Sequence, residues 1–223
     1  MGIRFVLVDL DRTLFPSLEF AKDARMTALR AMKKEGMKAS VAKAYVELMK
    51  VVEEMGPNHA DHFGELLARL GERKEGSAKI IAAGVFAYHR AKTRIKPFPE
   101  AGRALARMRR EGLKLYVASE GRSVKQWDKI LRMHVQEYFD GAFISEELGV
   151  EKGRKFYAKI ARKLGVRPGE VLMIGDKMDR DVEPARKAGM RAIFLDRKKK
   201  TGGKKRDVAK NLLEAAEISI DSM

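Results

Sequence analysis

IRFVLVDLDRT, residues 3–13, is the stretch of the sequence that decides the fold. Apart from Arg4, residues 3–8 are apolar, and the run ends on the carboxylate of Asp9. A short continuous apolar run is typical of a strand that is buried on both faces, as the strands of parallel sheets are. We therefore predict a strand over residues 3–9 with acidic side chains at its C-terminal end.

Similar apolar runs recur along the chain, clearly at 113–118, 171–175 and 191–195 and more weakly at 142–145 and 218–220. Between them lie apolar residues at helical spacing, such as Ala101, Leu105 and Met108. Strands that alternate with helices favour a parallel sheet. The predicted fold class is α/β, a three-layer Rossmann-like parallel sheet with helices on both faces.

The interval between the first two strands breaks this alternation, because residues 17–96 contain no strand-like run. Apolar residues recur there at helical spacing in three stretches, 44–55, 63–70 and 78–89. We predict an inserted, all-helical domain of three or four helices with its own small core. The domains are then 1–16 with 97–223, and 17–96. The connections between them contain proline and are expected to act as hinges.

Composition excludes several classes of protein. Hydrophobic residues make up 45% and charged residues 35% of the 223 residues, which indicates a globular chain. No apolar run is long enough to cross a bilayer, and nothing at the N-terminus resembles a signal peptide. The absence of cysteine excludes disulfides and thiolate chemistry. We expect a cytoplasmic protein without membrane contact, and the abundance of Lys, Arg and Glu also suits a thermophile.

The formal net charge of +16 raises the question of a polyanionic partner. Basic residues are densest at 197–206, where they surround two glycines and no aromatic residue. We interpret this run as a solvated loop, because a platform for stacking bases needs aromatic side chains. No specific nucleic-acid partner is expected. A nucleic-acid-binding protein remains the non-enzymatic alternative, and it rests on charge alone.

Two carboxylates, Asp9 and Asp11, stand at the end of the first predicted strand. Residues two apart on a strand point to the same side, and ligands of open parallel sheets bind outside the carboxyl ends of the strands. Two carboxylates held together repel each other, so they need a cation or a shared proton. The alternative is a solvated strand end with two capping aspartates.

The strand predicted at 171–175 also ends on acidic residues, with Asp176 directly after Gly175 and then Asp179 and Asp181. If the two strands are neighbours, Asp176 lies beside Asp9. Several oxygen ligands without thiolate or imidazole indicate a hard cation, and Mg²⁺ is the cofactor we expect. Asp179 or Asp181 is also expected to cap the helix that begins near Val182. Which of the two lies nearer the metal stays open.

Two further segments carry groups suited to an anion. Ser119 ends the second predicted strand, and Glu120 and Gly121 follow it. A hydroxyl with free backbone N–H groups before a helix suits an oxyanion, although Ser119 is equally well an ordinary helix cap. Lys152 can place a positive charge near a phosphate, and Lys155 competes with it for that role.

Taken together and in order, these segments resemble the four motifs of the haloacid dehalogenase-like superfamily, over nearly the whole chain. DLDRT at 9–13 is similar to D-x-D-x-T, Ser119 matches the second motif, Lys152 the third, and Gly175-Asp176 with Asp181 the fourth. The helical insertion resembles the family's first cap class. Arg12 stands where glycine is often found, and the exchange should be tolerated because this side chain need not touch the metal. Gly153 stands where proline often follows the lysine.

The resemblance implies a phosphatase that acts on a small phosphorylated metabolite, chosen by the cap. Asp9 would be the nucleophile that forms an aspartyl-phosphate, Asp11 the acid and base, and Thr13 a support of the loop. Mg²⁺ would be bound by Asp9, the Asp11 carbonyl and Asp176, with Asp181 nearby. Ser119, Glu120, Gly121 and Lys152 would hold the phosphoryl group. A phosphomutase or a 2-haloacid dehalogenase on the same fold is the enzymatic alternative.

Overall fold

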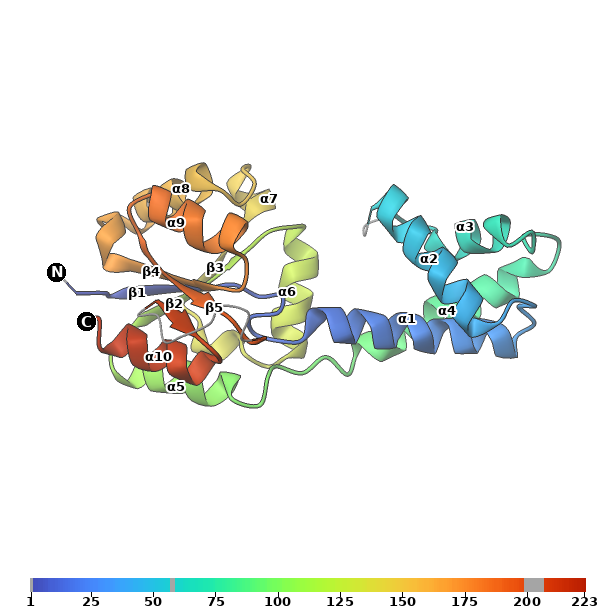
Figure 1. Ribbon diagram of the computed structural model, residues 1–223, viewed down its shortest axis with the longest axis horizontal. Coiled ribbons are helices and arrows are strands. Elements are labelled where there is room, and N and C mark those ends of the chain that lie inside the picture. Colours follow the sequence, from blue (N-terminus) through green and yellow to red (C-terminus); the bar gives the residue numbers. More distant parts are fainter. Residues whose placement is uncertain (1, 57–58, 199–206) are drawn as a thin grey trace. The chain divides into compact units, whose positions relative to one another are not determined.

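The structure is a computed structural model that describes residues 2–56, 59–198 and 207–223. Contacts between residues divide the chain into two units, Met1–Ser17 with Lys96–Met223, and Leu18–Ile95. The first unit is a sheet flanked by helices, and the second consists of helices (Figure 1). The first is called the sheet unit and the second the helical unit.

The sheet unit has six strands within the described residues, all parallel, in the order β3-β2-β1-β4-β5-β6. Their bounds are β1 Phe5–Val8, β2 Lys114–Ser119, β3 Gly141–Ile144, β4 Val171–Gly175, β5 Arg191–Leu195 and β6 Val208–Ala209. Strand β1 lies in the middle of the sheet, and Val6, Leu7 and Val8 are fully buried. Because both faces of β1 are covered, its sequence is apolar without alternation. The predicted α/β fold class is confirmed.

Helices cover the sheet on both faces. Figure 1 shows α5 (Ala101–Arg110) and α10 (Leu212–Ile220) on one face, and α8 (Arg154–Leu164) and α9 (Glu183–Lys187) on the other. Helices α6 (Ser123–Arg132) and α7 (Ser145–Leu148) complete the unit. A core on the α8 side joins Leu7 and Met173 of the strands to Phe156 and Ile160. No helix within the described ranges is long and apolar enough to cross a membrane.

The C-terminal segment differs from the prediction. The strand predicted at 218–220 is wrong, because these residues end α10. Leu212, Ala215, Ala216 and Ser219 of this helix are buried at helical spacing, and the Asn211 side chain caps its first turn by accepting from the Glu214 amide. The sixth strand, β6, is two residues long and too short for a recognisable sequence pattern.

The helical unit is built from α1 (Ser17–Lys34), α2 (Val41–Met55), α3 (His62–Arg69) and α4 (Ser77–Lys92). Its core joins Leu29 and Met32 of α1 to Leu48 of α2 and to Leu66 and Leu67 of α3. These residues form an apolar cluster of their own, so the unit buries enough surface to hold its helices together.

Helix α4 packs through a different face from the one its apolar residues suggest. Val85 and Phe86 belong to the predicted apolar stripe but are 39% and 67% exposed. The buried residues of α4 are the small ones, Ser77, Gly84 and Ala91. A side chain at position 84 would collide with Met32, so glycine lets α4 approach α1 closely.

The two connections to the helical unit leave the sheet unit side by side. The Phe98 amide donates to the Leu14 carbonyl at 2.8 Å. Arg197 joins the same two segments, because its guanidinium pairs with Glu100 at 2.7 Å, donates to the Thr13 carbonyl at 2.9 Å and stacks 3.5 Å from the Phe98 ring centre. Arg197 is therefore not part of a solvated loop as predicted. Residues 199–206 of that predicted loop lie outside the described residues.

We expect Arg197→Ala to lower the free energy of unfolding by about 2 kcal/mol, because it leaves Glu100 and the Thr13 carbonyl without a charged donor in a largely buried place. Lys198→Ala removes an exposed charge at the next position and is the matched control. Its effect should stay within about 0.5 kcal/mol. Urea denaturation of both variants measures the difference, and equal effects would contradict the role given to Arg197.

Candidate active site

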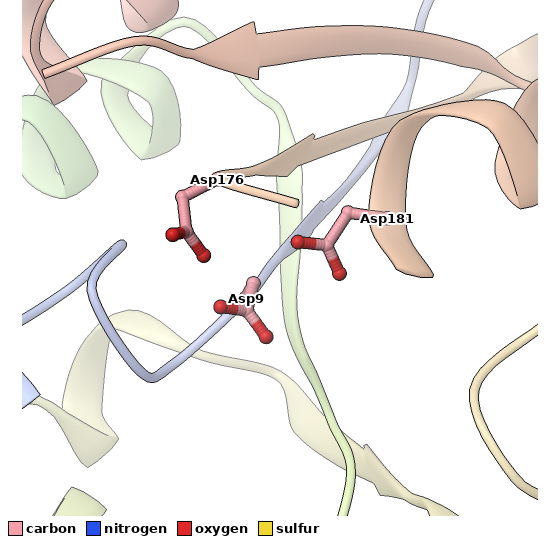
Figure 2. A group of neighbouring side chains, drawn as sticks. All are labelled: Asp9, Asp176 and Asp181. Carbon is pink, nitrogen blue, oxygen red and sulfur yellow. The ribbon is translucent and has the colours of Figure 1, made fainter. Parts of the chain in front are cut away.

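Three carboxylates meet at the C-terminal edge of the sheet. Asp9 follows β1 and donates its amide to the Ile174 carbonyl of β4 at 2.9 Å, which sets it beside Gly175 and Asp176. Asp181 reaches the same place from a π-type turn at Met178–Val182. Figure 2 shows the three side chains converging, and one oxygen from each lies within 4.8 Å of the others. Asp9 and Asp176 therefore lie close together, as predicted.

The turn after β4 explains why Asp181, and not Asp179, joins this cluster. Asp181 is fully buried and accepts from the Lys177 amide at 3.0 Å, whereas Asp179 is exposed. A side chain at Gly175 would collide with the Asp181 carboxylate, so glycine is required there. The following helix, α9, has no side-chain cap, and the expectation that Asp179 or Asp181 caps it is wrong.

Lys152 places a positive charge between two of the carboxylates. Its ammonium lies 2.5 Å from Asp9 Oδ1 and 2.6 Å from Asp181 Oδ1, and its side chain is buried. Burial lowers the pKa of Lys152, but the attraction of Asp9 and then of Asp181 outweighs burial and leaves the pKa raised. Lys152 therefore carries a permanent charge. Lys155, the alternative candidate for the phosphate-binding lysine, is exposed.

Asp176 has a raised pKa although Arg12 contacts it. Burial, followed by repulsion from Asp9, raises the pKa of Asp176 to about 6, although Arg12 opposes this shift. Asp176 Oδ1 is buried and has no hydrogen-bond partner among the described residues. A buried acceptor without a partner is costly, and a cation with oxygen ligands would remove that cost. The cluster therefore fits a hard divalent metal ion.

The loop between Asp9 and Phe15 has an unusual backbone. Arg12 has φ +64°, a left-handed conformation that glycine adopts readily and other residues rarely do. Its guanidinium Nε lies 2.6 Å from Asp176 Oδ2, so the side chain at this position does reach the acidic cluster. Thr13 is buried, and its hydroxyl has no hydrogen-bond partner within the described part of the chain.

Asp11 stands apart from the carboxylate cluster. Both of its oxygens lie close to the Lys129 ammonium of α6, at 2.7 and 2.9 Å. The side-chain oxygen of Gln126 accepts from the same ammonium at 3.1 Å, and the ammonium lies 5.8 Å from the Phe15 ring centre. The ion pair with Lys129 thus holds the Asp11 side chain in a partly exposed position.

Two side chains that the sequence analysis did not single out, Ser145 and Gln126, hold the segment after β2. Ser119 is buried at the strand end, and the Gly121 amide donates to the Ser145 hydroxyl at 2.9 Å. The Gln126 side chain donates to the Glu120 carbonyl at 2.9 Å. The N–H of Gly121 is therefore already engaged, whereas the sequence suggested free amides. The Glu120 carboxylate lies 3.9 Å from Arg180.

Of the site residues that the sequence analysis did not predict, some have a recognisable sequence pattern and others do not. Gln126 and Lys129 are three apart on the helix that follows Ser119, so they share a face that a search for polar pairs at helical spacing would have found. Tyr157 gave no such signal. It is buried behind the site, its hydroxyl donates to the Arg180 carbonyl at 3.0 Å, and burial, above all, raises its pKa.

Comparison with known proteins places the chain in a family. Residues 3–189 match the model of the haloacid dehalogenase (HAD)-like hydrolases. The chain is 41% identical over 201 residues to a glyceraldehyde 3-phosphate phosphatase of Methanopyrus kandleri, covering 88% of this chain and 85% of the relative. It is 36% identical over 195 residues to the enzyme of the same name from Pyrococcus furiosus, covering 86% and 80%.

Solved structures share the fold at lower sequence identity. A HAD phosphatase from Thermococcus onnurineus superposes with a TM-score of 0.67 at 21% identity, covering 97% of each chain. A 2-haloacid dehalogenase from Pseudomonas syringae gives a TM-score of 0.61, also at 21% identity and 97% coverage of each chain. At these identities the likeness shows the fold alone. With the family model and the relatives above, it follows that the chain belongs to the haloacid dehalogenase-like hydrolase family.

Proposed function

We propose that the chain is a Mg²⁺-dependent phosphatase of a small phosphorylated metabolite, and that glyceraldehyde 3-phosphate is its first candidate substrate. The observation that carries the proposal is the buried Asp9 carboxylate, in contact with Lys152 and within reach of Asp176 and Asp181. We choose this candidate substrate because the names of the two archaeal relatives specify it. The cytoplasmic location and the lack of a specific nucleic-acid partner stay predictions.

In the first step, a carboxylate oxygen of Asp9 attacks phosphorus. The bond from phosphorus to the ester oxygen breaks, and the leaving oxygen takes the electron pair and a proton from Asp11. The leaving group of glyceraldehyde 3-phosphate is a primary alcohol, which departs poorly without that proton. Substrate must therefore displace or loosen the Lys129 contact before Asp11 can act as the acid.

In the second step, water attacks the phosphorus of the aspartyl-phosphate. Asp11 accepts a proton from the water, the bond between phosphorus and the Asp9 oxygen breaks, and inorganic phosphate leaves. Lys152, Ser119 and the backbone N–H of Glu120 hold the phosphoryl oxygens during both steps, and the predicted role of Gly121 is reduced because its N–H already donates to Ser145. Thr13 supports the loop that carries Asp9 by being buried within it, since its hydroxyl has no hydrogen-bond partner among the described residues.

The metal would be held by the carboxylates of Asp9 and Asp176 and the main-chain carbonyl of Asp11, with Asp181 close by. When bound, Mg²⁺ neutralises charge on the transferring phosphoryl group. Without a cation, the repulsion between Asp9 and an anionic phosphate would oppose attack. Lys152 alone meets this need only in part, because Asp181 shares its charge.

The test is hydrolysis of glyceraldehyde 3-phosphate by purified protein, beside a panel of other phosphorylated metabolites. We expect release of phosphate that depends on Mg²⁺, stops after chelation and returns when the metal is restored. Ca²⁺ should substitute poorly, because it prefers larger and looser coordination. Full activity after exhaustive chelation would contradict the proposal and would favour metal-independent dehalogenase chemistry.

We assign residues 1–16 and 97–223 to a catalytic core domain and 17–96 to a cap that selects the substrate. A short glycine-serine linker in place of the helical unit should leave a folded sheet unit, because the hydrogen bond between Phe98 and Leu14 keeps the two ends together. Its kcat/KM should fall much further for glyceraldehyde 3-phosphate than for a small aryl phosphate. Circular dichroism reports the fold, and equal losses on both substrates in a folded variant would count against selection by the cap.

A further inference from the structure

Arg12 occupies a backbone position that does not suit it. Among the described residues with positive φ, only Arg12 and His134 are not glycine. The backbone at Arg12 is set by a tight loop, in which its amide donates to the Phe15 carbonyl at 2.9 Å and the Leu14 amide donates to the Leu10 carbonyl at 3.0 Å. Glycine would fit this loop without strain. The arginine side chain must therefore contribute something that offsets the cost.

The contact of that side chain with Asp176 supplies the reason. Arg12 Nε lies 2.6 Å from Asp176 Oδ2, a charge-assisted contact to a mostly buried carboxylate. Lys152, another cation of the site, contacts Asp9 and Asp181 and has no ion pair with Asp176 within the described part of the chain. A guanidinium does not lose its proton in a protein, so the contact persists at every pH at which the protein is folded.

We infer that Arg12 is an internal counter-cation of Asp176, whose positive charge opposes the binding of a metal ion at this carboxylate. The inference rests on the proposed metal site. A metal that binds Asp176 through its unpartnered Oδ1 must approach the positive charge that Arg12 holds at Oδ2. Arg12 therefore weakens metal binding and, in return, stabilises the crowded carboxylates when no metal is present.

The experiment is calorimetric titration of chelator-treated protein with MgCl₂. Arg12→Asn removes the charge and keeps a residue that tolerates the left-handed backbone, and Arg12→Gly removes both charge and strain. Both variants should bind Mg²⁺ at least about tenfold more tightly than the unmodified protein, since a like charge a few ångströms away is gone. Arg4→Asn is the matched control, because Arg4 is an exposed arginine paired with Glu170, and its affinity should not change.

Thermal unfolding gives a second readout that does not need turnover. Without metal, Arg12→Asn should unfold at a lower temperature than the unmodified protein, and saturating Mg²⁺ should close the gap. Equal or weaker Mg²⁺ binding by both Arg12 variants would overturn the inference. Asp176→Asn distinguishes failure of the Arg12 role from failure of the proposed metal site. If Asp176→Asn abolishes Mg²⁺ binding while the Arg12 variants bind as the unmodified protein does, only the role of Arg12 fails. If Mg²⁺ binds Asp176→Asn normally, the proposed metal site fails as well.

Discussion

Crowding of like charge at the C-terminal edge of the sheet is the constraint on which the rest of the site depends. Asp9, Asp176 and Asp181 each bring a carboxylate oxygen within 4.8 Å of the other two, in a place largely closed to water. Such a cluster is stable only if cations balance it. Lys152 compensates Asp9 and Asp181, and Arg12 compensates Asp176. Burial, and then repulsion from Asp9, still raise the pKa of Asp176 to about 6.

The sheet topology brings these carboxylates to one edge of the sheet. Strands β1 and β4 are parallel neighbours, so the residues that follow them meet at one edge. Gly175 allows the chain to fold back, so that Asp181 reaches the cluster. A second network, outside the cluster, runs from the Glu120 carbonyl through Gln126 and Lys129 to Asp11. The nucleophile and the acid of the proposed mechanism are thus held by different lysines, in a buried and a partly exposed environment.

Sequence reasoning reached those parts of the molecule that depend on local pattern. Strand β1 and the acidic residues after β4 were predictable because buried parallel strands are apolar on both faces and end on the ligand side of the sheet. The contacts of Arg12 and Arg197 were not predictable, because each depends on where a distant segment lies. The buried face of α4 was missed for a related reason: Gly84 and its small neighbours pack closely, while the larger Val85 and Phe86 are exposed.

The proposed mechanism requires that Asp9 becomes phosphorylated during turnover. The most direct measurement uses glyceraldehyde 3-phosphate labelled in its phosphate, with the reaction quenched within one turnover and the labelled peptide mapped. Asp11→Asn should slow turnover by roughly 10²–10⁴-fold and let the intermediate accumulate, since water activation is impaired. We predict label on Asp9 in this variant and no label in Asp9→Asn. Label on Asp11 in the unmodified protein, or turnover preserved in Asp9→Asn, would contradict the account.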